Sequence, residues 1–406
     1  MIIAKMNSQT QKPKKRRRLP LFLLILFIVA FICWIVPLPK IKAQSGYVYK
    51  SRPAPVSLAW PAYGQSAIGA EGYGVLDSHG QQVPAPMASV TKVITALAVM
   101  KQKPLAHGDQ GPTITITAQD VAAYNSYSAQ GGSVVAVTEG EQISEYQALQ
   151  AMLLPSANNM ADTLARWAFG SVDKYVSFAN GYLKQQGFTN SHIDDASGFS
   201  AKSTSTAQDL TGLGLIYEDN SVLQDIATQP TAEIPVAGTV HNTNWLLGTN
   251  GVSGIKTGNT EQAGGCYLVA AKRVVDGQNL MLVGAIMGAP DLTTAIADSQ
   301  PLLSSAADSF YSVTVAKRDQ VVGIYVAPWG EVANVLSRDD VSILTWKTRQ
   351  VVSSMQIDNN RVTVAKNQDI GQITATVWGR KNTGKLIVDN SISAPGWQWR
   401  LYKRHF

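Results

Sequence analysis

The chain has 406 residues, of which 45% are hydrophobic and 15% are charged, a balance that fits a globular protein with a sizeable core. At this length, two domains with additional segments are expected rather than one domain. The formal net charge of +6 is unevenly distributed, because residues 1–18 and 317–406 are basic whereas residues 19–316 are acidic overall. These basic parts do not form one continuous basic face, so nucleic-acid binding is excluded from the expected functions.

The N-terminal region predicts a membrane anchor. The basic run KKRRR at 14–18 precedes an apolar segment at 19–39, and the residues from Leu19 to Val36 carry no charge, which is about the length that crosses a bilayer. Basic residues on the N-terminal side predict a cytoplasmic tail at 1–18 and a transmembrane signal-anchor at 19–39. The rest of the chain then lies outside, in a single-pass protein of the cell membrane. A cleaved signal peptide, cut near 41–44, is the alternative.

The positions of the cysteines and histidines indicate neither a disulfide framework nor a metal site. Cys33 lies in the apolar segment and Cys266 is the only other cysteine, so no intramolecular disulfide is expected in the exported part. The five histidines have no metal-ligand spacing. We therefore predict no metal and no cofactor.

Residues 40–55 are expected to be a linker, and residues 56–311 mix strand and helix patterns. The run 72–83 predicts a hairpin, and Asp276–Gly277 predicts the turn between two later strands. Helices are expected over 89–101, 143–154, 158–170, 171–187, 206–219 and 292–311, and strands over 251–258, 264–274 and 279–288. This order predicts an α/β mixed (α+β) domain, an antiparallel sheet backed by helices. Residues 313–406 predict a small all-β domain that includes a final strand at the chain end.

Ser89 and Lys92 open the first of these helices, just ahead of an apolar run. Residues three apart share a helix face, so the lysine amine can reach the serine hydroxyl. A lysine in a dry pocket has a lowered pKa and can take the serine proton. The pattern alone is weak, and a second pair, Ser171 and Lys174, fits a helix N-cap and a solvated lysine instead.

Two further motifs follow at fixed order along the chain. Ser156 and Asn158 lie between two expected helices, where a helix N-cap is the alternative interpretation. Lys256, Thr257 and Gly258 lie in an expected strand, where an edge lysine and a turn are the alternative. Ser-x-x-Lys, Ser-x-Asn and Lys-Thr-Gly in this order form the signature of penicillin-binding proteins and class A β-lactamases.

The chain resembles the low-molecular-mass penicillin-binding proteins that act as D-alanyl-D-alanine carboxypeptidases. The resemblance covers most of residues 56–310 and includes MASVTK, MLLPSANNMADTLA, DASGFSAKSTSTAQDL and GIKTGNTEQAGGCYLVAA. It implies a catalytic domain at 56–311 with the penicillin-binding-protein/β-lactamase-like fold, followed by a β-rich C-terminal domain at 313–406. It also implies that peptidoglycan stem peptides ending in D-Ala-D-Ala are the substrate and that β-lactams are inhibitors.

The resemblance also implies a role for each motif residue. Ser89 is the nucleophile that forms an acyl-enzyme, Lys92 is its general base, and Ser156 relays a proton to the leaving amine. Asn158 and Gly258 hold the substrate backbone. Lys256 lowers the pKa of Lys92 and polarises Ser156, Thr257 contacts the terminal carboxylate, and the N–H groups of Ser89 and Asn259 form the oxyanion hole.

Two departures from the family keep alternatives open. Some relatives carry an arginine just after the last strand of the sheet, where this chain has Ala289 and Pro290, so DD-endopeptidase action is an alternative to strict carboxypeptidase action. Many relatives carry a C-terminal amphipathic helix as the membrane anchor, whereas this chain ends in PGWQWRLYKRHF, and the N-terminal segment is expected to take its place. A β-lactamase and a non-catalytic cell-wall scaffold are further alternatives. The glutamates between Ser156 and Lys256 lack the Glu-x-x-Leu-Asn pattern of class A β-lactamases.

Overall fold

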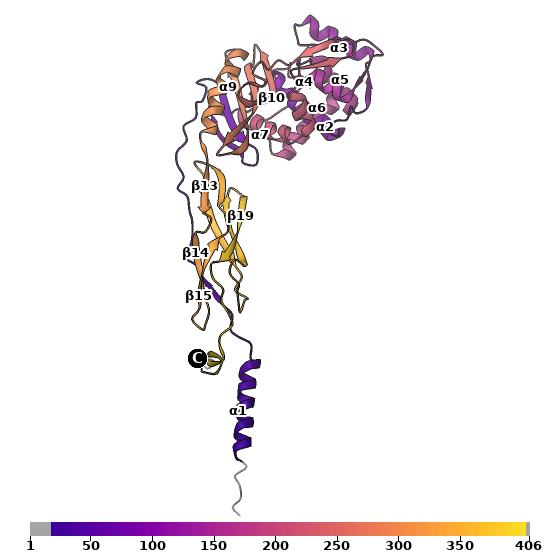
Figure 1. Cartoon of the computed structure of the whole chain (residues 1–406). Coiled ribbons are helices and arrows are strands. Elements are labelled where there is room, and N and C mark those ends of the chain that lie inside the picture. The colour runs from indigo at the N-terminus through magenta and orange to yellow at the C-terminus, as the bar shows by residue number, and fades with distance from the viewer. Residues whose placement is uncertain (1–17, 403–406) are drawn as a thin grey trace, which may run out of the picture.

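The computed structural model describes residues 18–402 and shows an elongated molecule (Figure 1). A head at one end is followed by a narrower β-rich region, and helix α1 (Arg18–Ile35) lies at the far end. The expected basic tail falls almost entirely on residues 1–17, outside the described residues. In the described part of the chain, no helix is long and apolar enough to cross a membrane, so the predicted transmembrane segment stays a prediction.

The head contains a five-stranded antiparallel sheet in the order β10-β11-β12-β2-β3. Its strands are β2 (Gln65–Ala70), β3 (Gly74–His79), β10 (Val252–Thr260), β11 (Gly264–Val275) and β12 (Gln278–Ala289). The β11–β12 turn is Asp276–Gly277, as predicted, and both residues have positive φ angles of 48° and 74°. The prediction of a hairpin within residues 72–83 is wrong. Gly72 and Gly74 take the positive φ angles of the turn, so β3 runs through Asp77 and pairs with β2.

Helices cover both faces of this sheet. Successive residues of a strand point to opposite faces. Ala67 and Leu268 pack in the cluster with α7 (Ala207–Glu218), whereas Ile68 and Val269 pack in the cluster with α9 (Leu292–Ala307). Helix α9 ends four residues before the expected boundary, because residues 310–316 form strand β13 with the β-rich region.

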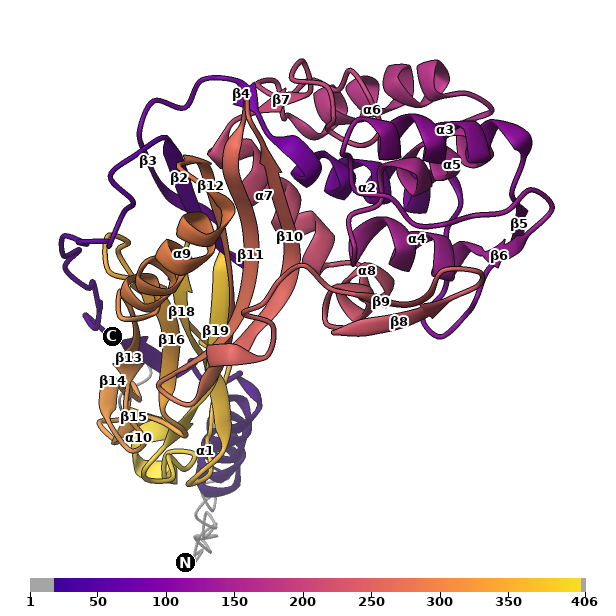
Figure 2. The ribbon, with the colours of Figure 1, turned by 90° about the horizontal axis from the view of Figure 1, so that it is seen from above.

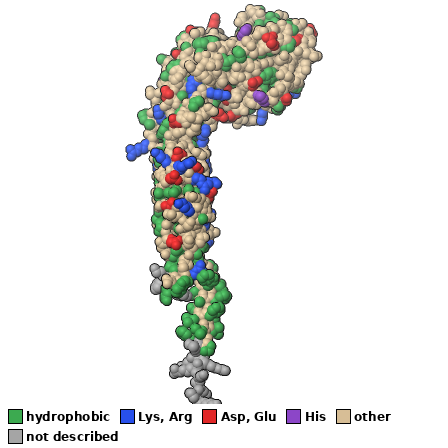
Figure 3. All heavy atoms as spheres, viewed as in Figure 1, with side chains coloured by type: hydrophobic (Ala, Val, Ile, Leu, Met, Phe, Trp, Pro, Cys, Tyr) green, Lys and Arg blue, Asp and Glu red, His purple; other side chains and the backbone are tan. Residues whose placement is uncertain are grey.

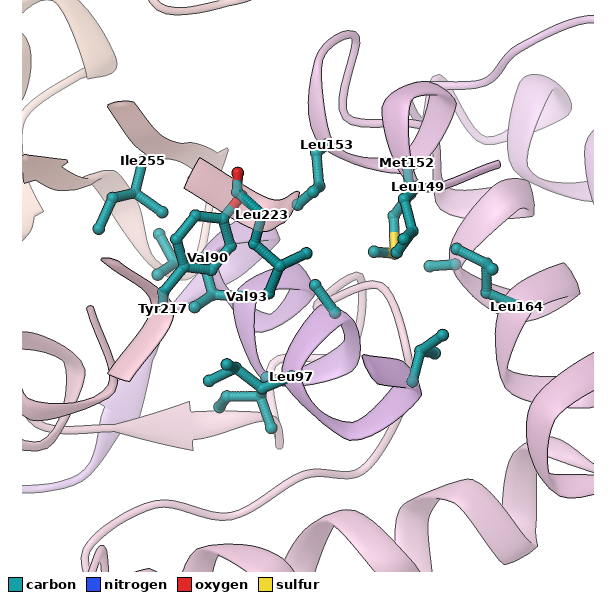
Figure 4. Close-up of a cluster of buried hydrophobic side chains, with 14 of the residues drawn as sticks. Val90, Val93, Leu97, Leu149, Met152, Leu153, Leu164, Tyr217, Leu223 and Ile255 are labelled. Atoms are coloured by element: carbon teal, nitrogen blue, oxygen red, sulfur yellow. The ribbon is translucent and has the colours of Figure 1, made fainter. Parts of the chain in front are cut away.

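A helical lobe lies beside the sheet (Figure 2). Helix α2 (Thr91–Gln102) runs through its centre, and its apolar residues Val93 and Leu97 are buried with side chains from the surrounding helices (Figure 4). The turn η1 (Ala88–Val90) precedes α2. The other helices of the lobe are α3 (Ala118–Ala129), α4 (Glu145–Leu153), α5 (Asn158–Phe169), α6 (Val172–Gln186) and α8 (Ser221–Ala227).

The helix ends in this lobe follow the sequence signals. Ser171 Oγ accepts a hydrogen bond from Lys174 N at 3.2 Å, so this serine is the predicted N-cap of α6. Gly170 and Gly187 end α5 and α6 with φ angles of 84° and 86°. Helices α3 and α8 were not expected from the sequence. Three short strand pairs were also not expected: β4 (Ala85–Pro86) with β7 (Thr204–Ser205), β5 (Thr113–Thr115) with β6 (Gln142–Ser144) and β8 (Thr231–Ile234) with β9 (Gly238–His241). The short 3-10 helix η2 (Thr249–Gly251) precedes β10.

The β-rich region has a six-stranded sheet in the order β1-β14-β15-β19-β18-β17 and a separate pair, β13 with β16. Strand β1 (Lys42–Gln44) comes from the expected linker at 40–55 and pairs antiparallel with β14, so this segment belongs to the sheet. The remaining strands are β13 (Phe310–Ala316), β14 (Val321–Val326), β15 (Val332–Ser337), β16 (Val341–Trp346), β17 (Val352–Ile357), β18 (Asp369–Val377) and β19 (Arg380–Val388).

The chain end differs from the strand expected there. Residues Trp397–Tyr402 form a short helix, α10, beside the α1 end of the molecule, and the Arg400 guanidinium lies 4.4 Å from the centroid of the Trp34 ring. The first four residues of the run WQWRLY alternate between aromatic and polar, a pattern that fits either a strand or a helical turn, and the described structure forms the helix.

Candidate active site

Ser89 lies in η1, where the chain turns into α2. Ala88 has a φ of 48°, and its carbonyl oxygen accepts a hydrogen bond from Thr91 Oγ1 at 2.8 Å. A Cβ atom at Gly198 would meet Ala88 O at 1.8 Å, so only glycine allows this close approach of the two segments. The nucleophile candidate is therefore held in a backbone position fixed from both sides.

Lys92 is fully buried, and all three ammonium protons have acceptors. Its Nζ donates to Ser89 Oγ at 2.9 Å, to Asn158 Oδ1 at 2.7 Å and to the Ser197 carbonyl oxygen at 2.8 Å. Burial lowers the pKa of Lys92 to about 7, although the negative charges of Asp195 and Asp162 act to raise it. A neutral amine in contact with the serine hydroxyl is thus accessible near neutral pH, and it can accept the hydroxyl proton.

Ser156 and Asn158 lie at the junction of α4 and α5. Asn158 is the first residue of α5, and Ala157 occupies the N-cap position without a side-chain cap, so neither polar side chain serves as the N-cap of α5. Ser156 has a φ of 66°, and its buried hydroxyl has no hydrogen-bond partner among the described residues. A buried hydroxyl without a partner is destabilising, and such a group is typical of a functional site.

Lys256 and Thr257 lie in β10, which borders the helical lobe. Lys256 is 1% exposed, and burial followed by repulsion from Lys92 lowers its pKa well below the ordinary lysine value. Its Nζ donates to the Thr257 carbonyl oxygen at 3.0 Å. The expected polarisation of Ser156 by Lys256 has no direct hydrogen bond in the structure. Thr257 Oγ1 and Thr243 Oγ1 are 2.6 Å apart, which ties the strand to the neighbouring loop.

Gly258 brings β10 against the start of α2. A Cβ atom at this position would lie 3.0 Å from Ser89 N, 3.1 Å from Ala88 Cβ and 3.1 Å from Met87 O. The next residue, Asn259, lines a cavity of about 550 Å³ together with Ser89 and Asn158. The full lining is Ser89, Gln130, Gly131, Gly132, Ser133, Asn158, Gly198, Phe199, Asn259, Thr260, Glu261 and Gln262. Ser89, Asn158 and Asn259, the residue that follows Lys-Thr-Gly, therefore line one cavity.

Asp195 supports the site but was missed as a site residue. Its carboxylate accepts hydrogen bonds from the backbone N–H groups of Gly198 at 3.1 Å and Phe199 at 2.9 Å and from Ser203 Oγ at 2.6 Å. These bonds fold the loop that presents the Ser197 carbonyl to Lys92. The run DASGFS contains the signal for this turn, since an aspartate ahead of small residues folds its own backbone.

The remaining candidates from the sequence behave as structural residues. Cys266 is fully buried in β11, and burial raises the pKa of its thiol to about 11, which makes it a poor nucleophile. Within residues 18–402, no group of three or more His, Cys, Asp or Glu side chains is placed to hold a metal ion.

Comparison with known proteins places this site in a family. Residues 66–291, more than half of the chain, match the D-alanyl-D-alanine carboxypeptidase family. The carboxypeptidase DacF of Bacillus subtilis is 24% identical over 76% of this chain and 78% of its own length, and DacA of Escherichia coli is 27% identical over 63% and 64%. Penicillin-binding protein 5 of Haemophilus influenzae has the same fold, with a TM-score of 0.57, 21% identity and coverage of 84% of this chain and 98% of that protein. The chain therefore belongs to the D-alanyl-D-alanine carboxypeptidase family, and it is a serine hydrolase of that activity.

Proposed function

We propose that Ser89 is the nucleophile and Lys92 the general base of this carboxypeptidase. The observation that carries the proposal is the 2.9 Å contact between Lys92 Nζ and Ser89 Oγ, made by a fully buried amine whose pKa is lowered to about 7. Lys92 takes the hydroxyl proton as Ser89 Oγ bonds to the carbonyl carbon of the penultimate D-alanine. The peptide C–N bond then breaks, the leaving amine receives a proton, and water later hydrolyses the ester on Ser89.

The other motif residues receive roles around this step. Ser156 relays the proton to the leaving amine, which fits its buried hydroxyl without a partner in the described structure. Asn158 and Gly258 hold the substrate backbone. Lys256 is the second buried amine beside Lys92, and repulsion between the two, when both are protonated, favours loss of a proton from the pair. In the same scheme, Thr257 contacts the terminal carboxylate and the N–H groups of Ser89 and Asn259 bind the oxyanion.

The test compares wild-type chain with Ser89→Ala in detergent solution. We expect D-alanine release from a stem-peptide mimic ending in D-Ala-D-Ala by wild type only, and covalent labelling by a fluorescent penicillin by wild type only. Labelling that persists in a folded Ser89→Ala protein would overturn the assignment of the nucleophile. The Ser171→Ala variant is the matched control, because it removes the hydroxyl of another Ser-x-x-Lys pair, where the serine is a helix N-cap.

The end of β12 favours a second substrate form. Ala289 is 2% exposed, and the Asp291 carboxylate caps α9 by accepting a hydrogen bond from Thr294 N at 2.7 Å. Residues 287–291, at and just after the end of β12, include no basic side chain that could pair with a terminal carboxylate. Cross-linked stem peptides, in which the cleaved bond is internal, are the second candidate substrate. Incubation with purified cross-linked dimers distinguishes this endopeptidase action from release of free D-alanine.

We also propose that the apolar segment 19–39 attaches the protein to the membrane, with the head on the outer side. Support comes from the uncharged run 19–36 and from the exposed apolar side chains of α1 from Leu21 to Ile35 (Figure 3). Membrane fractions washed with alkaline carbonate should retain the full chain. Recovery of the protein in the soluble wash contradicts this attachment.

A further inference from the structure

Asp162 is a partly buried acidic residue next to the site that the mechanism above does not use. It lies one helical turn after Asn158 on α5, and Asn158 Oδ1 accepts the 2.7 Å hydrogen bond from Lys92 Nζ. Residues four apart share a helix face, so the Asp162 carboxylate lies on the face of α5 that Lys92 contacts. Its side chain is 15% exposed.

Tyr127 connects Asp162 to the wall of the cavity. The Tyr127 hydroxyl donates to Asp162 Oδ2 at 3.2 Å, and the Tyr127 ring packs edge-on against Phe199 with centroids 5.4 Å apart. The Tyr127 carbonyl oxygen accepts a hydrogen bond from Gly132 N at 2.9 Å. Because Phe199 and Gly132 both line the cavity, Asp162 supports its wall as well as facing the lysine.

The Asp162 carboxylate interacts with two basic side chains, Arg166 and Lys92. Arg166 Nη1 lies 3.8 Å from Asp162 Oδ2, but Arg166 Nη2 is held more closely by Asp120 Oδ1, at 2.6 Å. Burial raises the pKa of Asp162 to about 6, while Arg166 and Lys92 oppose this rise. Asp162 is therefore ionised at neutral pH, and its charge in turn raises the pKa of Lys92.

Other ionisable groups face this pair from each packed element. Asp195 acts on Lys92 in the same direction as Asp162, and the charge of Lys92 in turn lowers the pKa of Lys256 of β10. The hydroxyls of Tyr175 on α6 and Thr95 on α2 share a hydrogen bond, with the oxygens 2.7 Å apart. Burial raises the pKa of Tyr175, so this residue stays neutral. The ionisable residues of α4 act elsewhere, since Glu145 interacts with Lys103, and Tyr146 donates a hydrogen bond to Asp225.

We propose that Asp162 is a positioning residue whose negative charge favours the protonated form of Lys92 in the empty enzyme. The proposal rests on the proposed role of Lys92 as general base. Its consequence is that Asp162 sets the lower pH limit of acylation, because Lys92 must lose its proton before Ser89 can attack.

The test measures the second-order rate of acylation of the full-length protein by a fluorescent penicillin between pH 5 and 9. Removal of a nearby negative charge eases deprotonation of Lys92. In Asp162→Asn we therefore expect the midpoint of the acid limb to move to lower pH by about half a unit or more. Asp162→Glu restores the charge and should return the midpoint toward wild type. The control is Asp173→Asn, an exposed acid in the first turn of α6, which should leave the midpoint unchanged.

The possible outcomes separate this proposal from the proposed function. A wild-type protein that is not labelled at any pH sinks the proposed function itself. A labelled Asp162→Asn with a lower rate but the wild-type midpoint overturns the charge effect and leaves a structural role. Should Asp162→Asn not fold, Tyr127→Phe removes the hydroxyl that donates to the carboxylate, and its midpoint should move in the same direction by less. An unmoved midpoint in Tyr127→Phe then overturns the proposal.

Discussion

Two lysines of the head and the paired basic side chains of the β-rich region are held in opposite ways. In the head, Lys92 and Lys256 are buried, and neither makes a salt bridge with a carboxylate in the described structure. In the β-rich region, pairs such as Lys385–Asp369 at 2.9 Å and Arg318–Asp339 at 3.3 Å have exposed side chains. Burying a lysine without a counter-charge is destabilising, whereas exposed pairs change stability little. The contrast indicates that the two buried lysines are retained for chemistry.

The strongest test of this contrast replaces Lys92 by methionine. Lys92→Met keeps the buried volume but removes the amine that contacts Ser89, the proposed base. We expect the acylation rate to fall by about a thousandfold, within the range that general-base loss produces. Stopped-flow or gel-based labelling with a fluorescent penicillin measures this rate. Labelling within tenfold of wild type would show that another group takes the serine proton.

Gly258→Ala tests how closely the sheet must approach the nucleophile. The added methyl group would lie 3.0 Å from Ser89 N and would push β10 away from α2. We expect about a tenfold loss of kcat/KM, because small displacements of reacting groups reduce rates strongly. The control is Gly181→Ala in α6, where the new methyl group meets no atom within 4 Å. Equal activities of the two variants would contradict the role of this contact.

Lys92→Met should also change how stability depends on pH. The pKa of Lys92 is about 7 in the folded protein and has its ordinary value of 10.5 in the unfolded chain. Between these values the unfolded chain binds more protons, so the free energy of unfolding of wild type falls as pH decreases from 10 to 7. Methionine removes this dependence, although Asn158 and Ser197 lose a donor. Relative to wild type, the variant should gain about 4 kcal/mol as pH falls from 10.5 to 7. At pH 10.5 it should be the less stable protein, because the lost hydrogen bonds to Asn158 and Ser197 are missing at every pH.

Thermal unfolding at several pH values checks this expectation. A variant whose advantage over wild type is the same at pH 7 and pH 10.5 contradicts the assigned protonation of Lys92.

The smallest effect is expected at the surface of the β-rich region. Arg318 and Asp339 have side chains that are 68% and 52% exposed. Arg318→Ala should change the free energy of unfolding by less than about 0.5 kcal/mol and leave acylation at the wild-type rate. Denaturant unfolding and penicillin labelling measure both quantities. A loss of more than 1 kcal/mol would mean that surface pairs here carry more stability than the contrast allows.

A local pattern in the sequence proposed the first pair of the candidate site, and the three motifs together with the family resemblance located the rest. The spacing of Ser89 and Lys92 places both on one face at the start of a helix, and this contact forms at 2.9 Å. The resemblance then supplied the partners of this pair from distant parts of the chain, including Asn158, which contacts Lys92. The Ser197 carbonyl was not predicted, since a backbone oxygen leaves no side-chain signal and depends on the turn around Asp195.

The fold was predicted where short-range signals decide it and missed where long-range pairing does. The turn at Asp276–Gly277 was predicted because its residue types favour positive φ angles. The hairpin at 72–83 failed because Asp77 and Gly80 also look like turn residues, and the partner strand, β2, lies before the run. Strand β1 looked like a linker because its partner in the described structure is β14, where Gln44 pairs with Ile324, 280 residues later.

The pairing of β1 with β14 makes the head an insertion within the β-rich region. The chain passes from β1 to the head along residues 45–64, and Ser51 N and Ala54 N bond to the carbonyl oxygens of Val351 and Lys347 on the way. It returns through α9 into β13. Two connecting segments, rather than one, therefore join the head to the β-rich region. A single proteolytic cut in either connection leaves the other in place, so the active site stays tethered to the rest of the molecule.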